Sequence, residues 1–223
     1  MFGQILIWVA FLSSLFGLVA FATALRLTPR TAGGMAPIKH RGALPPQVRS
    51  WLLSARAAHG VAMICLLAAV AFLMHLVLTH QFQYTYVYRY SSRDLPLHYL
   101  ISAFWAGQEG TFLLWAAYSA LLGFVATVTV QRFQAGVMTF VMLLQSFLLL
   151  ILVRLSPFAL YPAGSPIPPD GAGLNPLLQD PWMVIHPPML FLGFASTAIP
   201  AAFAMHALAR GDSEDWVKGA LPW

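Results

Sequence analysis

Five apolar stretches, each free of Asp, Glu, Lys and Arg, dominate this sequence of 223 residues. Each stretch has 19 to 27 residues, and a helix needs roughly 20 residues to cross a bilayer. Together the stretches make up half of the chain, and only 9% of all residues are charged, which excludes a soluble globular enzyme. Unbroken apolar runs also exclude the alternating strands of a membrane β-barrel. The sequence therefore predicts a single membrane domain, an all-α integral membrane protein with about five transmembrane helices. The predicted spans lie near residues 5–25, 57–79, 110–130, 135–153 and 183–209.

The first stretch is predicted to stay in the protein as a helix. It lacks a preceding basic segment, and it is longer than the roughly 7 to 15 apolar residues of a signal peptide. Cys65 is the one cysteine and lies inside the second stretch, so the chain cannot form an internal disulfide or a thiolate metal cluster.

Positive charge is concentrated in the loop between the first two stretches. Residues 26–56 contain six Lys and Arg residues and no acidic residue, so the positive-inside rule places this loop in the cytoplasm. The N-terminus and the segments 80–109 and 154–182 are then outside, and the C-terminus is cytoplasmic. This orientation accounts for the net charge of +5, and no nucleic-acid partner is predicted.

The segment before the third stretch has its own helical pattern. A helix start at Asp94-Leu95-Pro96 is followed by apolar residues at i, i+3, i+4 and i+7 spacing. This pattern predicts an amphipathic helix near residues 96–109 that lies on the outer surface. The same pattern also fits an outward extension of the third transmembrane helix.

His186 is the most informative ionisable residue, because it precedes two consecutive prolines at the start of the fifth stretch. A residue before proline avoids the α region, so His186 is predicted to be displayed just ahead of the helix. A neutral imidazole there can bind a metal or a haem iron, and Asp180, Asn175 or Gln179 could orient its second nitrogen. The alternative is a loop histidine that caps the helix or packs on lipid headgroups.

Other ionisable residues allow a competing class of function. Glu109 lies where the predicted outer helix meets the third stretch, either as a functional acid or as an interfacial carboxylate. With His59 and His75 it could form a proton or ion path in a transport subunit, although the uncharged spans speak against this. A third possibility is a scaffold subunit without chemistry of its own.

Two tracts of the sequence are recognisable as a pair. The first is FWAGQEG at residues 104–110, and the second runs from LNPLLQDP at 174–181 into IHPPML at 185–190. In this order and between apolar spans, they resemble the N-terminal part of the cytochrome c maturation protein F family, the CcmF or NrfE type, which is the haem lyase component of cytochrome c biogenesis. The likeness covers the whole chain and is strongest over 90–195.

The resemblance implies a function in cytochrome c biogenesis. Such a protein takes haem from the haem chaperone CcmE and helps to attach it through thioether bonds to the CxxCH motifs of apocytochrome c, alongside the partners that reduce and hold the substrate thiols. It works in the bacterial or mitochondrial inner membrane, on the periplasmic or intermembrane side. The charge pattern places His186 in that same compartment.

The resemblance also suggests roles for individual residues. His186 matches an axial haem ligand, and Trp105, Gln108, Glu109 and Asp180 match positions that shape or support the haem site. The sequence ends before the family's tryptophan-rich haem-handling tract and before the histidines that hold a structural b-type haem. The resemblance therefore implies that the C-terminal portion, on another chain or in a longer protein, is needed for activity.

Overall fold

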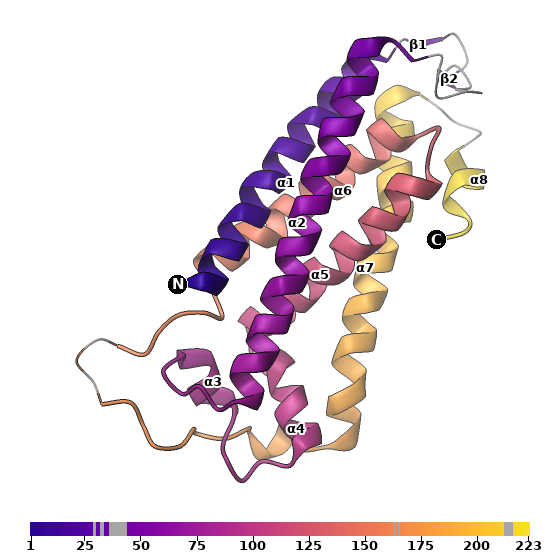
Figure 1. Ribbon diagram of the computed structural model, residues 1–223. Coiled ribbons are helices and arrows are strands. Elements are labelled where there is room, and N and C mark those ends of the chain that lie inside the picture. Colours follow the sequence, from indigo (N-terminus) through magenta and orange to yellow (C-terminus); the bar gives the residue numbers. More distant parts are fainter. Residues whose placement is uncertain (29, 32–33, 36–43, 163, 165, 212–215) are drawn as a thin grey trace.

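A computed structural model describes all residues except 29, 32–33, 36–43, 163, 165 and 212–215. Five helices in the described part are long and apolar enough to cross a membrane, and each coincides with one predicted stretch. The expected all-α membrane fold is thereby confirmed (Figure 1). These helices are α1 (Phe2–Leu27), α2 (Pro46–Leu78), α5 (Gln108–Thr129), α6 (Gln134–Arg154) and α7 (Pro181–Arg210).

The helices pack as a bundle with α7 at one side. Helix α1 packs on α2 and α6, whereas α5 contacts α2, α6 and α7 (Figure 1). Buried apolar side chains form two clusters, one near each end of the bundle. Helix α7 contributes to the second cluster only, through Ile199, Ala202 and Phe203. The first half of α7 therefore lies outside the main apolar core.

Short elements divide between the two ends of the bundle. One end, called here the α4 end, carries α3 (Thr85–Tyr90), α4 (Leu97–Ser102), the 3-10 turn η2 (Ala103–Trp105) and a second 3-10 turn, η3 (Pro176–Leu178). The other end, the α8 end, carries the two-residue strands β1 (Arg30–Thr31) and β2 (Gly34–Met35) and the short helix α8 (Trp216–Ala220) (Figure 1). Segments 80–109 and 154–182 share the α4 end, as alternating spans require, and the compartment that each end faces stays a prediction.

The predicted surface helix near 96–109 is shorter than expected. Helix α4 ends at Ser102, η2 continues to Trp105, and Gly107 then takes an extended conformation (φ −111°, ψ 163°) as the N-cap of α5. The third transmembrane helix consequently starts at Gln108 and does not extend outward. Glycine stands at this break because a side chain there would overlap the Tyr90 ring.

Two loops that are distant in sequence are joined at the α4 end. The backbone N–H of Thr85 donates to the Ala159 carbonyl (2.9 Å), and that of Ala172 donates to the Tyr88 carbonyl (2.7 Å). The Asp170 carboxylate accepts from the backbone N–H of Arg93 (2.9 Å). These bonds join segment 83–93 to Ala159 and to residues 170–172 at this end of the bundle.

At the α8 end, arginine side chains connect the helices. The Arg56 guanidinium of α2 donates to the side-chain carbonyl of Gln134, at the start of α6. Arg210, in the last turn of α7, donates to the backbone carbonyls of Leu25 and Thr28, where α1 ends. The first and the last membrane helices are therefore linked directly at this end.

Candidate functional site

His186 lies in the second turn of α7, with both following prolines inside the helix. The expectation that it precedes the helix is wrong, because α7 already begins at Pro181. The expectation that it is displayed is confirmed, since the side chain is exposed. Neither ring nitrogen makes a hydrogen bond to any residue that the structure describes. The imidazole is thus accessible to a ligand from outside this chain.

An exposed apolar surface surrounds His186 on α7. Trp182 and Leu190 lie one turn before and after it, Met189 lies three positions on, and Trp182 is 74% exposed. Next to this surface, α7 packs on Trp115 of α5 through Phe191 and Phe194. In this half of α7 the large exposed apolar residues are Trp182, Met183, Ile185, Met189, Leu190, Leu192 and Phe194.

Polar side chains fix the start of α7. The Asp180 carboxylate accepts from the backbone N–H of Trp182 (2.8 Å), so Asp180 is the N-cap of the helix. The Tyr99 hydroxyl on α4 donates to the Gln179 carbonyl (3.0 Å). The Asn175 side chain accepts from the Leu177 amide, at the start of η3. These residues thus hold the backbone near His186 and do not hydrogen-bond to its ring.

Trp105 connects the two sequence tracts. Its indole Nε1 donates to the backbone carbonyl of Met183, one turn before His186 (3.2 Å). The side chain comes from η2, at the end of the short helical run that precedes α5. The FWAGQEG tract and the HPP tract therefore meet in space through this bond.

The FWAGQEG tract makes a tight turn around the hydroxyl of Tyr86. This buried hydroxyl donates to the Phe104 carbonyl (2.7 Å) and accepts from the Gly107 amide (3.2 Å). A side chain at Gly110 would overlap the Phe104 carbonyl and the Tyr86 hydroxyl, so only glycine fits there. Burial is the main cause that raises the pKa of Tyr86, and the nearby Glu109 carboxylate raises it further. The hydroxyl consequently stays protonated and can keep donating.

The remaining predicted residues are placed differently from His186. Gln108 is exposed and Glu109 is half-buried, both in the first turn of α5, where an acid is favoured by the helix dipole. In the described part of the chain, neither residue hydrogen-bonds to α7. The pKa of Tyr90 is raised mainly by burial and then by Glu109.

The histidines of the transport hypothesis are not connected to Glu109. His59 is buried mid-bundle, with ring nitrogens 3.1 Å from the Met142 sulfur and from the Ala120 carbonyl oxygen. His75 is exposed in the last turn of α2. No group of three or more His, Cys, Asp or Glu side chains in the described part of the chain could hold a metal ion.

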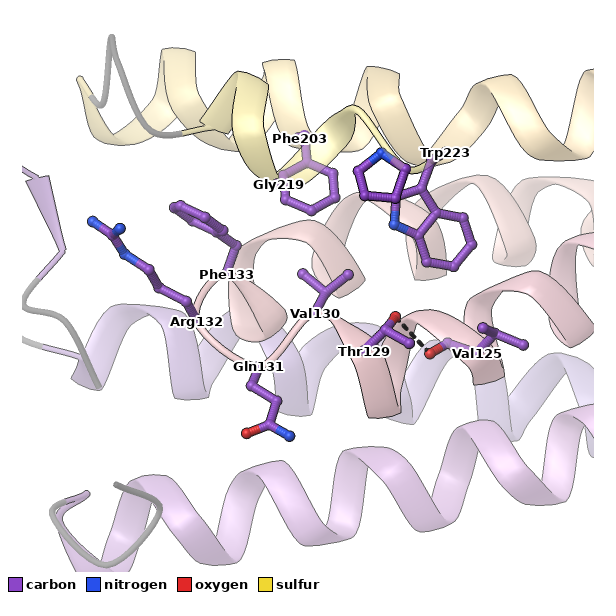
Figure 2. Close-up of a pocket in the computed structure, with 10 residues that line it drawn as sticks. Val125, Thr129, Val130, Gln131, Arg132, Phe133, Phe203, Gly219 and Trp223 are labelled. Carbon is purple, nitrogen blue, oxygen red and sulfur yellow. Dashed lines mark hydrogen bonds between the residues drawn. The ribbon is translucent and has the colours of Figure 1, made fainter. Parts of the chain in front are cut away.

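A cavity of about 460 Å³ lies at the opposite end of the bundle from His186. Figure 2 shows it between the α5–α6 turn, α7 and the C-terminal segment, with the Phe133, Phe203 and Trp223 rings along its walls. The Arg132 guanidinium lies over the Phe133 ring, 5.0 Å from its centroid. This cavity shares no lining residue with the two sequence tracts.

Sequence reasoning missed Tyr86, Tyr99 and the Met183 carbonyl. Each of the three takes part in a hydrogen bond to a backbone group that joins segments distant in the sequence. The spacing of residues within one segment does not indicate such a bond. The crowding at Gly110 is likewise visible only once the Tyr86 hydroxyl is in place.

The fold and this site define a polytopic helical membrane protein that displays a histidine, His186, on an apolar helix face. The chain matches the family description "Cytochrome C assembly protein" over residues 105–218, which is half of its length. The chain belongs to this family.

Similar proteins have related names. The chain is 34% identical over 185 residues to a "Cytochrome c-type biogenesis protein CcmF" of Pseudomonas fluorescens, covering 80% of this chain and 28% of that protein. It is 29% identical over 211 residues to the Escherichia coli K12 protein of the same name, covering 92% of this chain and 31% of that protein. A solved structure named "Cytochrome c Heme Lyase CcmF" superimposes with a TM-score of 0.73 at 25% identity, covering 99% of this chain and 32% of that one. The chain thus spans about three tenths of the length of these relatives.

Proposed function

We propose that this chain forms the part of a cytochrome c haem lyase that presents His186 to haem as an axial ligand. The observation that carries the proposal is the exposed imidazole, which is not hydrogen-bonded to any described residue and stands on an apolar helix face. Family membership supports it, since relatives of this chain are named cytochrome c biogenesis proteins and a haem lyase.

The residues around His186 fit a flat apolar ligand with a metal at its centre. A neutral imidazole binds haem iron, and Trp182, Met189 and Leu190 offer apolar surface beside it. Iron takes a second axial ligand, which we assign to the portion of the relatives that lies beyond this chain. Trp105, Gln108, Glu109 and Asp180 would then support the site from the adjoining turn and helix ends.

The reaction we assign to the complete assembly adds two cysteine thiols across the two vinyl groups of haem. Each S–H adds to a C=C bond, so a thioether forms and no further reactant is needed. Haem would arrive from the chaperone CcmE, and the thiols belong to the CxxCH motif of apocytochrome c, which other partners keep reduced. The chain would hold haem in place for this step, with the remaining portion of the relatives on the same or a second chain.

The proposed location follows from charge. Six basic residues over 26–56, from the last turn of α1 into the first turns of α2, favour the cytoplasm for the α8 end. The α4 end with His186 would then face the periplasm of a bacterial inner membrane or the mitochondrial intermembrane space.

The test is a reduced absorption spectrum of the purified complex. The tagged chain is produced with the haem chaperone and with the remaining portion of the family, as wild type, His186→Ala and His98→Ala. His98 is the matched control because it is an exposed histidine at the same end, on α4. We expect His186→Ala to lower bound haem at least tenfold and His98→Ala to leave it unchanged. Equal haem in all three proteins would overturn the ligand assignment and leave a scaffold or transport subunit.

A further inference from the structure

Two consecutive prolines interrupt the hydrogen bonds of α7 close to His186. In an α-helix the N–H of residue 187 donates to the carbonyl of residue 183, but Pro187 has no N–H. The helix nevertheless continues from Pro181 to Arg210. The Met183 carbonyl therefore lacks its usual partner within the helix, and a donor from outside the helix can take that place.

Trp105 supplies that donor. Its Nε1 lies 3.2 Å from the Met183 carbonyl oxygen, and the two residues are 78 positions apart in the sequence. The indole thus replaces the backbone N–H that Pro187 lacks. It also ties this turn of α7 to a different part of the molecule.

The segment that carries Trp105 is itself held rigidly. The Phe104 side chain is 1% exposed, and the Phe104 carbonyl accepts from the Tyr86 hydroxyl. Gly110 packs directly against the same carbonyl, which leaves it no room to move. The indole N–H is therefore presented from a fixed position.

The direction of the His186 ring depends on the backbone of its own turn. No described residue hydrogen-bonds to the imidazole, so the ring has no side-chain support of the kind that usually orients a histidine ligand. Met183 lies one turn earlier, on the same side of α7. We infer that Trp105 is a positioning residue, which fixes the turn that carries His186 by donating to the Met183 carbonyl in place of Pro187.

This inference deepens the proposed function and rests on it for the role in haem binding, but the positioning itself can be measured without haem. The first readout is hydrogen exchange of the amides of residues 182–190 in the purified chain. The second is the reduction potential of haem in the complete complex, which responds to the orientation of an axial ligand.

The variants test directly whether the Trp105 indole N–H substitutes for the backbone N–H that Pro187 lacks. Trp105→Phe keeps an aromatic ring and removes the N–H, and Trp105→Phe with Pro187→Ala adds a backbone N–H in its place. Trp51→Phe is the control, since it removes an indole N–H from α2 near the α8 end. We expect Trp105→Phe to speed exchange over 182–190 about tenfold and to shift the potential. The double variant should return to within about twofold of wild type, and Trp51→Phe should match wild type.

Two outcomes would overturn the inference. One is unchanged exchange in Trp105→Phe, and the other is a double variant that exchanges as fast as Trp105→Phe alone or faster. Failure of the proposed function has a different signature. In that case His186→Ala keeps its haem, while Trp105→Phe still speeds exchange and Pro187→Ala still reverses it.

Discussion

The two halves of α7 are held in place by different forces. Residues 181–194 are largely exposed, contain three prolines and start at hydrogen bonds in which Asp180 accepts and Tyr99 and Trp105 donate. Residues 195–210 bury Ile199, Ala202 and Phe203 against the second apolar cluster. Packing in the apolar cluster thus secures one half, whereas the other depends on a few directional bonds and on the contact of Phe191 and Phe194 with Trp115.

One half of α7 thus anchors the helix in the bundle, and the other half exposes a surface. A half that is fixed by packing tolerates little change, because close-packed side chains leave no room for movement. A half that is fixed by a few hydrogen bonds can leave one face open, and that face carries His186. The two halves should therefore respond independently to substitutions.

The largest effect is expected in the packed half. Phe203 is 1% exposed and meets the Phe133 ring edge to face at 5.7 Å between centroids. Phe203→Ala should lower the free energy of unfolding by about 3 kcal/mol, the lower part of the range for truncating a buried aromatic residue. The cost is at the lower end because lipid, not water, surrounds the separated helices, so the loss is mainly one of packing contacts. Chemical unfolding in detergent measures this cost. Hydrogen exchange should rise over 195–210 and stay constant over 182–190.

Leu208→Ala is the matched control for Phe203→Ala, since Leu208 lies on the same half of α7 and is 80% exposed. It should change stability by less than about 0.5 kcal/mol. If hydrogen exchange in Phe203→Ala rises equally over 182–190 and 195–210, α7 responds as one unit and its two halves are not independent.

A smaller effect is expected for Gly110→Ala, which attacks the turn that carries Trp105. The new methyl group would overlap the Phe104 carbonyl and force the turn to shift, at a cost of about 2 kcal/mol. Exchange should rise over 182–190, because Trp105 loses its position, and stay unchanged over 195–210. Gly193→Ala is the control, since a methyl group there meets nothing within 4 Å. If Gly193→Ala is equally harmful, close approach at Gly110 is not the cause.

Asp180→Ala should have a milder effect, limited to the start of α7. Loss of the N-cap acceptor costs about 1 kcal/mol, and the first turn should fray. Mass-spectrometric exchange of a peptide covering 180–186 reports this fraying. Asp180→Asn keeps the acceptor, so it should behave as wild type. A defect in Asp180→Asn as large as that in Asp180→Ala would instead point to the charge.

The smallest effect concerns the loop pair at the α4 end. Backbone N–H groups of Arg93 and then Gly171 donate to the Asp170 carboxylate and hold its pKa below its usual range. A depressed carboxyl pKa stabilises the folded state above the unfolded value, about 4, and this stabilisation is lost as pH falls through the folded value. A nitroxide at Ile167→Cys in a Cys65→Ser background should become more mobile below about pH 4. In Asp170→Asn this pH dependence should be absent, and its persistence would exclude Asp170 as its origin.

The sequence was sufficient for the features that depend on composition along one segment. Uninterrupted apolar runs without charge can only be membrane helices, and all five coincide with helices in the structure. The alternation of loops also placed 80–109 and 154–182 at one end correctly. No knowledge of contacts between segments was needed for either result.

The errors arose where one segment depends on another. His186 is predicted ahead of the helix because a residue before proline avoids the α region and proline suits a first turn, yet α7 runs through both prolines. The Trp105 indole donates to the Met183 carbonyl there. The predicted helix at 96–109 stops at Trp105 because Tyr86 draws the chain into a turn around its hydroxyl. Neither partner can be identified from spacing, since they are 78 and 18 to 21 residues away.

The bonds from Arg210 to the end of α1 bear on the order in which the protein is assembled. Leu25 emerges from the ribosome long before Arg210, because 185 residues separate the two. Throughout that interval the end of α1 lacks this donor, and the bundle is open along the side that α7 will occupy. Insertion of α7 therefore closes the domain, and a chain interrupted before Arg210 would leave α1 without this last connection at the α8 end.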